Sequence, residues 1–258
     1  MAQTHLEGRR IVREVRDEHL GALVHPEWIV SFGWAVQGTT TREVAGEAFD
    51  LGLFSDGSPR SDVHGRWRRL IESAGMRGAV HAPQVHEAEV RIHDHTPTGL
   101  HLTDACDGHL TDRPGALLAV ATADCVPVFV VEPRARVVGV LHAGWRGAAC
   151  GVLERGVRLL LERSGGDARD VYIHFGPSIC GTCYQVGPEV FEALAQERPA
   201  APEPIDLRAV MAQRALALGA DPVKVTVSGH CTRCTGSSLF SHRGGDRGRQ
   251  VGFVGIRA

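Results

Sequence analysis

Cys125 and His142 are the residues of this sequence whose types and spacing point most directly to chemistry. A thiolate and an imidazole together make half of a zinc site, and without a metal the same pair can act as a nucleophile and its base. A third interpretation is a buried thiol beside a hydrogen-bonded histidine, because free cysteine is among the most buried residue types. All three depend on whether the chain brings the two side chains together.

The elements around these two residues predict that it does. Two β-branched runs, Val126–Glu132 and Val137–Leu141, flank the turn-forming segment Pro133–Arg136. The sixteen residues between Cys125 and His142 are too few for a crossover helix, so the runs predict an antiparallel hairpin. A symmetric register places the two residues opposite each other, with Cβ atoms roughly 5 Å apart. A slip by one residue would separate them onto opposite faces.

A third ligand is expected from the segment that precedes the hairpin. Between residues 86 and 92, alternation puts one set of side chains on an apolar face, namely His86, Ala88, Val90 and Ile92. This pattern predicts a strand over His86–Ile92 with His86 directed to the core. His81 precedes Pro83 in an expected loop, and His93 and His95 are expected in solvent. A Cys/His/His set leaves one tetrahedral position open, as in catalytic zinc sites.

The residues after His142 suggest a place for an anion. The chain continues Ala-Gly-Trp-Arg-Gly, a glycine-containing turn that leads into an expected helix over Ala148–Arg163. Free backbone N–H groups at a helix start, with Arg146 close by, suit a phosphate or carboxylate. The alternative is an ordinary strand-to-helix turn with Trp145 in the core.

Strands outnumber helices in the remaining pattern. Further strands are expected over Trp28–Phe32, Ala116–Thr122, Val171–Phe175, Val223–Val227 and Gln250–Ile256, and further helices over Asp62–Ser73, Pro188–Gln196 and Asp206–Leu218. The tight hairpin excludes a purely βαβ wound sheet, so we predict an α+β fold. We expect one domain over residues 1–258, with residues 1–25 as an N-terminal extension. No G-x-G-x-x-G and no P-loop is present.

Composition narrows the function classes. The 258 residues carry 28 basic and 30 acidic side chains, which excludes a strongly basic nucleic-acid scaffold. No apolar run approaches about 20 residues, and the charged N-terminus lacks the apolar segment of a signal peptide. We therefore expect a cytoplasmic protein with neither a nucleic-acid nor a membrane partner; no oligomeric state is predicted. Seven cysteines and 14 histidines in that setting favour ligands or nucleophiles over disulfides.

Four of the cysteines form two close pairs, Cys180-x-x-Cys183 and Cys231-x-x-Cys234. Such pairs are typical of structural zinc sites, but the gap between them is far longer than the roughly 15–20 residues of zinc ribbons. A second metal and buried core thiols are the two interpretations. Cys106 and Cys150 have no partner in the sequence and are expected to be packing residues.

Five segments together resemble one known family. They are Gln84-Val-His86, Ala123-Asp-Cys-Val-Pro127, His142-Ala-Gly-Trp-Arg-Gly147, Gly176-Pro-Ser-Ile179 with Cys183-Tyr-Gln-Val-Gly187, and Cys231-Thr232 followed by Phe240-Ser-His-Arg243. In this order they are similar to the YfiH-type family, also called the laccase-domain or multicopper polyphenol oxidase family. The resemblance extends from about Phe32 to the C-terminus.

The resemblance implies mixed sheets flanked by helices, as in a bacterial toxin cysteine deamidase. It implies a zinc enzyme that phosphorolyses adenosine, inosine, guanosine and methylthioadenosine and deaminates adenosine, with nucleoside and phosphate as its partners. The implied zinc ligands are His86, Cys125 and His142, the set that the hairpin indicates independently. We assign Gln84 and Asp124 to orientation or proton transfer. Contacts to substrate or phosphate are assigned to Trp145, Arg146, Ser241 and Arg243.

The chain departs from the family pattern in several loops. A usual Thr-Arg-x-Gly-Gly element is compared with Gly33–Thr40, which has no arginine, and the terminal Ser-Tyr-Arg-Arg reads Ser241-His-Arg-Gly244. We expect these departures to affect phosphorolysis most. The alternatives are a metal-free cysteine hydrolase with a Cys125/His142 dyad, a copper oxidase and peptidoglycan-precursor editing. Copper is disfavoured because a laccase needs several His-x-His pairs, and this chain has one, His93 and His95.

Overall fold

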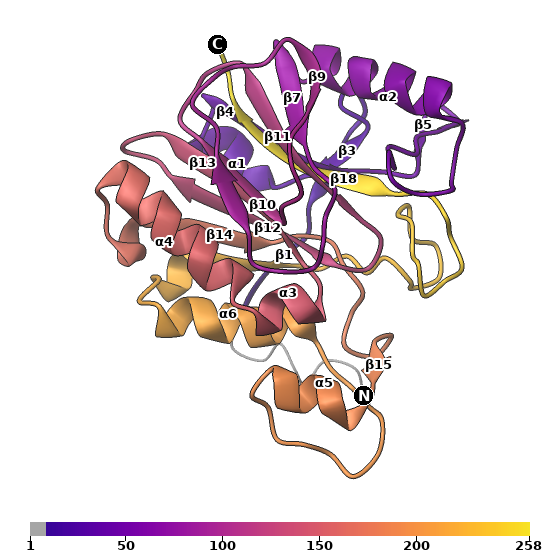
Figure 1. Cartoon of the computed structure of the whole chain (residues 1–258), viewed down its shortest axis with the longest axis vertical. Coiled ribbons are helices and arrows are strands. Elements are labelled where there is room, and N and C mark those ends of the chain that lie inside the picture. Colours follow the sequence, from indigo (N-terminus) through magenta and orange to yellow (C-terminus); the bar gives the residue numbers. More distant parts are fainter. Residues whose placement is uncertain (1–8) are drawn as a thin grey trace.

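Two large mixed β-sheets, stacked face to face, form the centre of the molecule (Figure 1). The structure is a computed structural model and describes residues 9–258. Sheet A runs in the order β1 (Arg10–Val12), β17 (Val225–Ser228), β14 (Tyr172–Phe175), β12 (Val126–Glu132), β13 (Val137–Ala143), β10 (Gly108–Thr111), β8 (Val90–Ile92). Sheet B runs β2 (Val15–Asp17), β3 (Ala22–Val24), β4 (Ala35–Thr40), β18 (Gln250–Ile256), β11 (Ala116–Thr122), β7 (Gly78–His81), β9 (Gly99–Leu102).

Both sheets combine antiparallel and parallel pairs. In sheet A, β12 pairs antiparallel with β13 and β14, whereas β14 pairs parallel with β17. In sheet B, β11 pairs antiparallel with β18 and parallel with β7. Two small ribbons lie outside the main sheets, formed by β5 (Glu43–Val44) with β6 (Glu47–Ala48) and by β15 (Gln185–Val186) with β16 (Glu203–Pro204).

The core between the sheets explains the continuous apolar runs of the central strands. Its buried side chains include Val120 from β11, Phe129 from β12, Val140 from β13 and Val254 from β18. Strands with both faces covered do not need a polar side, so β11, β12 and β18 are apolar along almost their whole length.

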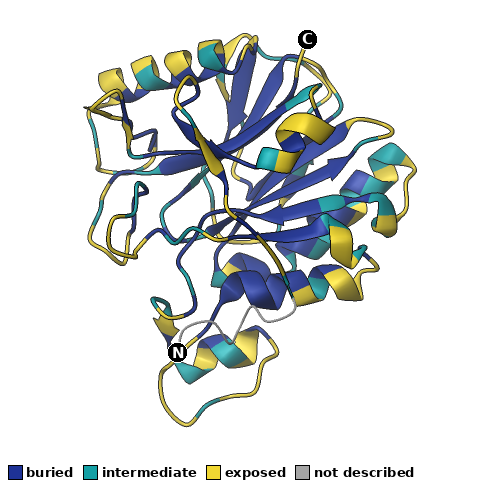
Figure 2. Cartoon of the chain, turned by 180° about the vertical axis from the view of Figure 1, so that it is seen from behind, coloured by how far each residue is buried: buried dark blue, intermediate teal, exposed yellow. Residues whose placement is uncertain are grey.

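Helices cover the outer faces of this sandwich. On sheet A lie α3 (Trp145–Ala149), α4 (Val152–Ser164) and α6 (Leu207–Ala217), with α5 (Pro188–Ala193) against α3; α2 (Arg60–Ser73) covers sheet B. Figure 2 shows dark, buried strands inside and exposed outer helix surfaces. Short 3₁₀ turns occupy Ala168–Asp170 and Pro222–Lys224. The predicted α+β fold of mixed sheets flanked by helices is confirmed.

The predicted strand over Trp28–Phe32 is wrong, because these residues belong to helix α1 (Pro26–Ser31) and its C-cap. Pro26 starts the helix, and the buried Trp28 and Phe32 lie four residues apart on one face. Ile29 and Val30 on the other side are 54% and 85% exposed. A short apolar run was thus misread as a strand.

Residues from the expected N-terminal extension take part in both sheets. Within the described part, β1 extends sheet A beside β17, and β2 and β3 extend sheet B beside β4. Glu14, between β1 and β2, is buried and lies 2.9 Å from the Nε2 atom of His174. Residues 1–8 of that extension lie outside the described residues. No helix in the described chain has the length and apolarity needed to cross a membrane.

Candidate metal centre

The predicted hairpin forms, with a register displaced by two residues from the symmetric one. Pro127 stands opposite His142 and Val126 opposite Ala143, so Cys125 follows in the position opposite Gly144. Cys125 and His142 are therefore diagonal neighbours instead of direct partners. Because side chains alternate with a period of two, this displacement keeps both on the same face. The predicted common face is confirmed, and the predicted direct opposition is wrong.

His86 lies in a bend and not in the predicted strand over His86–Ile92. Strand β8 begins only at Val90, and His86 has a left-handed φ of 62° and an exposed side chain. The cause is Asp107, whose carboxylate accepts the backbone N–H groups of Val85, His86 and Glu87 at 3.2, 3.0 and 2.9 Å. These bonds turn the chain, so the core-directed orientation expected for His86 is also wrong.

Asp107 also fixes the orientation of His142. Its Oδ1 atom lies 2.8 Å from His142 Nδ1, and both side chains are buried. Burial alone raises the pKa of Asp107, but the hydrogen bonds from His142 and from the backbone lower it overall, which keeps the carboxylate charged. Since Nδ1 is occupied, His142 presents its Nε2 atom to Cys125.

The sequence analysis missed Asp107. No spacing rule links it to His142, because the two residues meet only when β10 pairs with β13. A weak signal exists in hindsight, since Asp107 stands directly before a short strand, where a carboxylate can accept backbone N–H groups.

One ligand atom from each of His86, Cys125 and His142 converges in the structure, all within 4.8 Å of one another. Burial disfavours the charged forms of Cys125 and His142, but their mutual attraction and hydrogen bonding outweigh it. The pKa of the Cys125 thiol is lowered to about 6 and that of His142 is raised to about 9. At neutral pH the centre without a metal thus holds a thiolate beside an imidazolium.

Gly144 leaves room beside these three side chains. A Cβ atom at this position would lie 3.0 Å from Cys125 Sγ and 3.0 Å from His86 Cδ2, closer than ordinary van der Waals contact. Any larger residue would therefore press on two of the three ligands. Gly144 is the N-cap of α3 with φ −79°, which any residue adopts, so the close approach to the two side chains is what calls for glycine here.

Two cavities meet at Cys125. The larger, of about 310 Å³, is lined by residues of both sheets and the loops beside them, including Phe54, His81, Gln84, His142 and Arg249. The smaller, of about 190 Å³, is lined by residues that include Trp145, Tyr184, Leu207 and Arg243. Cys125 and His242 line both cavities. A small molecule with two parts thus finds a space on each side of the thiol.

The two residues assigned to orientation or proton transfer make bonds that hold backbone in place. Both amide atoms of Gln84 bind the backbone of Ala121 at 2.8 Å, which joins the His86 loop to β11. Asp124 has a left-handed φ of 87°, and its two carboxylate oxygens accept hydrogen bonds from Thr232 Oγ1 at 2.6 Å and Arg243 N at 2.7 Å. In this arrangement both side chains position the segments that carry His86 and Cys125.

The residues assigned to substrate or phosphate lie at different places. Trp145 and Arg243 line the smaller cavity, and the Arg243 guanidinium lies over the Tyr184 ring and donates to Gln185 O. Arg146 is exposed and lies over the ring of Trp145. Ser241 is buried, and its hydroxyl accepts the N–H of Gly244 within its own loop.

The other local histidines differ from expectation. His81, expected in a loop, ends strand β7 and is buried, with Nδ1 3.0 Å from Ala119 O and no partner for Nε2. Burial lowers the pKa of His81 to about 4, so the ring is neutral, and it lines the larger cavity. His93, expected in solvent, lies 2.9 Å from the buried His109.

The segment Gly33–Thr40, which was compared with the family's Thr-Arg-x-Gly-Gly element and has no arginine, ends directly before a Thr-Arg pair. Thr41-Arg42 follows β4 directly, and Arg42 binds Asp246 and lies over the Phe240 ring in the loop that also carries Ser241.

Of the unpaired cysteines, Cys106 is buried as expected, whereas Cys150 is exposed. Burial raises the pKa of Cys106 to about 11, so its thiol stays protonated.

Comparison with known proteins gives consistent matches over most of the chain. The family model described as "Multi-copper polyphenol oxidoreductase laccase" matches residues 36–257. "Purine nucleoside phosphorylase YlmD" of Geobacillus stearothermophilus is 34% identical over 253 residues, which cover 88% of this chain and 92% of the relative. "Adenosine deaminase RL5" from an unidentified prokaryote is 34% identical over 192 residues, which cover 67% of this chain and 72% of the relative.

A solved structure supports the same grouping. The crystal structure of YlmD from Geobacillus stearothermophilus superposes with a TM-score of 0.82 and 30% identity, covering 96% of this chain and 100% of that one. The chain therefore belongs to the multi-copper polyphenol oxidoreductase laccase family, the YfiH family that its motifs resemble.

Proposed function

We propose that this protein is a zinc-dependent enzyme of purine nucleosides, which phosphorolyses adenosine, inosine, guanosine or methylthioadenosine and deaminates adenosine. The observation that carries the proposal is the convergence of His86, Cys125 and His142 where two cavities meet. The names of its relatives, a purine nucleoside phosphorylase and an adenosine deaminase, supply the substrate class.

The donor set fits a zinc ion. A thiolate and two imidazoles are ligands that zinc prefers, and three protein ligands leave a position for a substrate. The Asp107–His142 contact matches the carboxylate–histidine arrangement that orients zinc ligands. When bound, zinc supplies Lewis-acid chemistry at this point. The close approach at Gly144 keeps space beside the ligands free.

The residues of the chain would then bind and orient the nucleoside. The larger cavity offers the neutral His81, whose unpartnered Nε2 atom accepts a hydrogen bond from a donor such as an exocyclic amine. Phe54, 54% exposed on the same cavity, offers an aromatic face for a purine. Arg249 gives the cavity a positive charge that suits a phosphate, and the His242 ring lines the cavity with it.

Copper is the less favourable metal for this chain, in spite of the family's description. Within residues 9–258, two clusters of three or more closely spaced ligand residues occur, and neither is a group of histidines that would hold a trinuclear centre. The single His-x-His pair is directed elsewhere, with His93 bound to the buried His109. This arrangement supports a mononuclear site at His86, Cys125 and His142 and no trinuclear copper centre among the described residues.

A metal-free cysteine hydrolase is the second candidate. It is favoured by the charge state of Cys125 and His142, which form a thiolate–imidazolium pair at neutral pH, with Asp107 bound to the second imidazole nitrogen. A nucleophile, a base and an orienting carboxylate in this order make a cysteine-type triad. His86 helps to lower the pKa of Cys125 through a hydrogen bond, but it is neither the nucleophile nor the base of such a mechanism. His86→Ala should therefore keep part of the activity of a thiol enzyme and lose that of a zinc enzyme, which separates the two candidates.

The experiment that tests the proposal measures metal content and turnover together. Purified protein and its Cys125→Ser and His86→Ala variants are analysed for zinc and copper, and adenosine and inosine are supplied with and without phosphate. We expect each variant to bind one zinc ion per chain fewer than the wild type and to lose activity. Free base formed only with phosphate would identify phosphorolysis, and inosine formed from adenosine without phosphate would identify deamination. Full activity of a zinc-depleted preparation, with His86→Ala active, would instead establish the thiol enzyme.

A further inference from the structure

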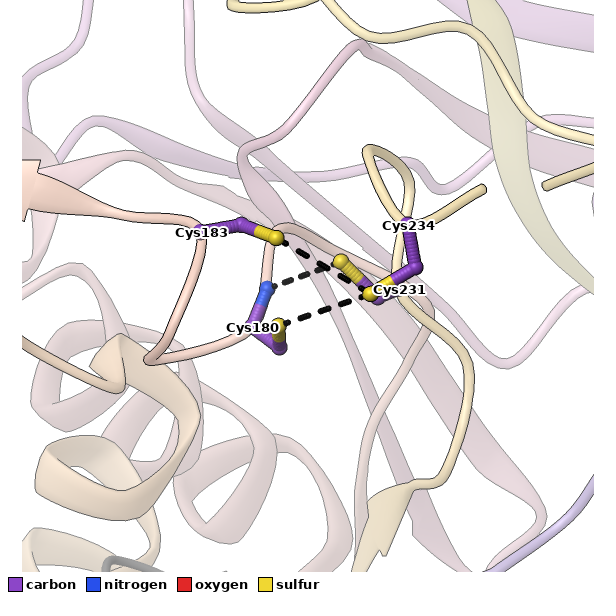
Figure 3. A group of neighbouring side chains, drawn as sticks. All are labelled: Cys180, Cys183, Cys231 and Cys234. Atoms are coloured by element: carbon purple, nitrogen blue, oxygen red, sulfur yellow. Dashed lines mark hydrogen bonds between the residues drawn. The ribbon is translucent and has the colours of Figure 1, made fainter. Parts of the chain in front are cut away.

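Four cysteines that the proposed function does not use gather at one point of the surface. Cys180 and Cys183 follow strand β14, and Cys231 and Cys234 follow strand β17. Figure 3 shows the four side chains reaching toward one another from two separate loops. The four sulfur atoms lie within 4.8 Å of one another.

The topology explains how the long gap in the sequence is closed. Strands β14 and β17 are parallel neighbours, so both loops leave sheet A at the same edge. A bridge between Ser178 and Cys231 continues the pairing beyond the strands, and Thr232 N donates to Ser178 O at 3.1 Å. The spacing argument against a zinc site therefore does not apply to this chain, because the helices and strands between the pairs fold away.

The distances suit a metal and not a disulfide. Cys234 Sγ lies 3.9 Å from Cys180 Sγ and 3.8 Å from Cys183 Sγ. A zinc ion with four thiolates at about 2.3 Å makes a tetrahedron with edges of about 3.8 Å, whereas a disulfide bond is about 2.05 Å long. The alternative of core thiols is wrong, because Cys180, Cys183 and Cys231 are only half-buried and Cys234 is exposed.

The surroundings also suit thiolates. The backbone N–H groups of Cys180 and Arg233 donate to Cys231 Sγ at 3.2 and 3.4 Å. Hydrogen bonds of this kind commonly orient the residues that bind a metal. Arg233 lies beside the cluster and donates to Cys183 O. Four thiolates around one divalent ion leave two negative charges, and positive side chains nearby offset them.

A buried ion pair joins both loops from below. The Arg208 guanidinium, at the start of α6, donates to Ser228 O at 3.0 Å and His230 O at 3.1 Å, just before Cys231. Its partner Asp206 accepts the N–H of Gly181, between the first two cysteines, at 3.3 Å. The two loops are thus held at a fixed separation by residues that are not cysteines.

We propose that Cys180, Cys183, Cys231 and Cys234 hold a zinc ion in a closed structural site, separate from the centre at Cys125. All four positions of the ion are filled by protein, and none of the four cysteines lines the cavities that meet at Cys125. The site joins the two loops that hold Asp124 in place. The Asp124 carboxylate accepts a hydrogen bond from the Thr232 hydroxyl, and its backbone carbonyl accepts one from the N–H of Ile179. The ion thereby stabilises the segment next to Cys125 without taking part in the reaction.

The test is a zinc count on five preparations of the full chain. We expect about two zinc ions per chain in the wild type, about one in Cys125→Ser, about one in Cys234→Ser and none in the double variant. Cys234 is chosen because it is exposed, and Cys150→Ser, an exposed thiol outside both sites, is the matched control that keeps both ions. No zinc in Cys125→Ser would overturn this proposal, while an unchanged zinc count in Cys125→Ser would contradict the proposed metal centre instead.

A spectroscopic readout keeps the proposal testable if Cys234→Ser does not fold. Cobalt(II) is introduced into Cys125→Ser, where the four-cysteine site is the one that remains. We expect tetrahedral d–d bands with thiolate-to-cobalt charge transfer, and zinc should displace them. A six-coordinate spectrum, or four thiols that titrate freely or are found as disulfides in the native protein, would refute the site.

Discussion

The two proposed metal centres both use cysteine ligands, but one is open to cavities and the other is closed. The centre at Cys125 draws three ligands from three segments and borders two cavities, whereas the four-cysteine cluster draws its ligands from two loops and borders neither. An open position admits a substrate, and a filled one excludes it. Both proposed centres contain cysteine. What distinguishes the proposed reactive centre from the proposed structural site is the number of protein ligands and the access to the ion.

A carboxylate organises each centre in a similar way. Asp107 accepts three backbone N–H groups from the His86 loop and binds His142, while Asp206 accepts Gly181 N and pairs with Arg208. In one case the carboxylate orients two ligands directly, and in the other it holds the loops that carry them. Changes to the two aspartates should therefore separate activity from stability.

The largest expected effect is on activity at Cys125. We expect Cys125→Ser to lose turnover of adenosine and inosine by roughly a thousandfold or more, because the metal and its open position are lost together. The thermal unfolding midpoint should fall in both Cys125→Ser and Cys234→Ser, because each loses an ion that binds the folded protein. Cys234→Ser should nevertheless keep its activity per folded molecule within a few-fold of the wild type. Equal losses of activity in both variants would remove the contrast between the centres.

The next effect is on stability at Asp206. Replacing it by asparagine leaves the Arg208 charge buried without a partner, which typically costs about 3–5 kcal/mol of unfolding free energy. Urea unfolding of Asp206→Asn against wild type measures this loss. A matched Asp221→Asn variant, whose side chain caps an exposed 3₁₀ turn, should lose well under about 1 kcal/mol, because asparagine caps about as well as aspartate.

The same pair predicts a pH dependence. Burial alone raises the pKa of Asp206, but hydrogen bonding and attraction to Arg208 lower it below its unfolded value. The stabilisation is therefore complete above the unfolded pKa of about 4 and is lost as the pH falls through the folded value. The stability difference between wild type and Asp206→Asn should shrink below about pH 4. A difference that stays constant from pH 7 to pH 3 would contradict the assignment.

A smaller effect is expected at Asp107. Asp107→Asn keeps the size of the side chain but weakens the hold on His142 and on the His86 loop, and supporting residues of this kind typically contribute about 10–100-fold to metal affinity or activity. Zinc competition with a chelator and steady-state turnover measure the two losses. The four-cysteine zinc should be unaffected, so the count in Asp107→Asn after mild chelation should fall to about one per chain.

The smallest effect is expected at Gly144. Gly144→Ala adds a Cβ atom 3.0 Å from Cys125 Sγ and from His86 Cδ2, which must move by a few tenths of an ångström. We expect up to about a tenfold loss of zinc affinity with little change in stability. Gly65→Ala in α2, where nothing lies within 4 Å of the added atom, is the control that leaves the ligands alone. Identical affinities in wild type and Gly144→Ala would show that the ligands have room to spare.

Much of the sandwich follows from pattern, since long apolar runs specify long strands. The strands at residues 116–122, 126–132 and 250–256 have the predicted bounds, and α2, α4 and α6 lie within a few residues of theirs. Short strands such as β9 and β10 were not predicted, because a run of four residues is too short to show a periodicity that distinguishes it from a loop. Trp28–Phe32 failed for the same reason, as a strand and a one-and-a-half-turn helix look alike over so few residues.

The candidate site was predictable where two residues of suitable chemistry lie on one hairpin, so that local strand pairing brings them together. The hairpin placed Cys125 and His142 on one face because their separation is set by a short turn. His86 was selected by an alternation whose strand begins only at Val90, and Asp107 left only a weak signal in the sequence because its partners come from other segments. The four cysteines met only because β14 and β17 are neighbours, a pairing that no spacing rule contains.

The turn at the far end of the β12–β13 hairpin has its own consequence. Glu132, fully buried at the end of β12, accepts the N–H groups of Arg134 and Ala135, and Glu132 pairs with Val137 across a four-residue loop. An insertion or deletion of one residue that shifted the pairing would turn Cys125 and His142 to opposite sides of the sheet. A length change in residues 133–136 therefore keeps the two side chains on one face only if the loop absorbs it without shifting the pairing of β12 with β13, or if the pairing shifts by two residues. Arg136, with a left-handed φ of 52°, further restricts which residues suit the last loop position.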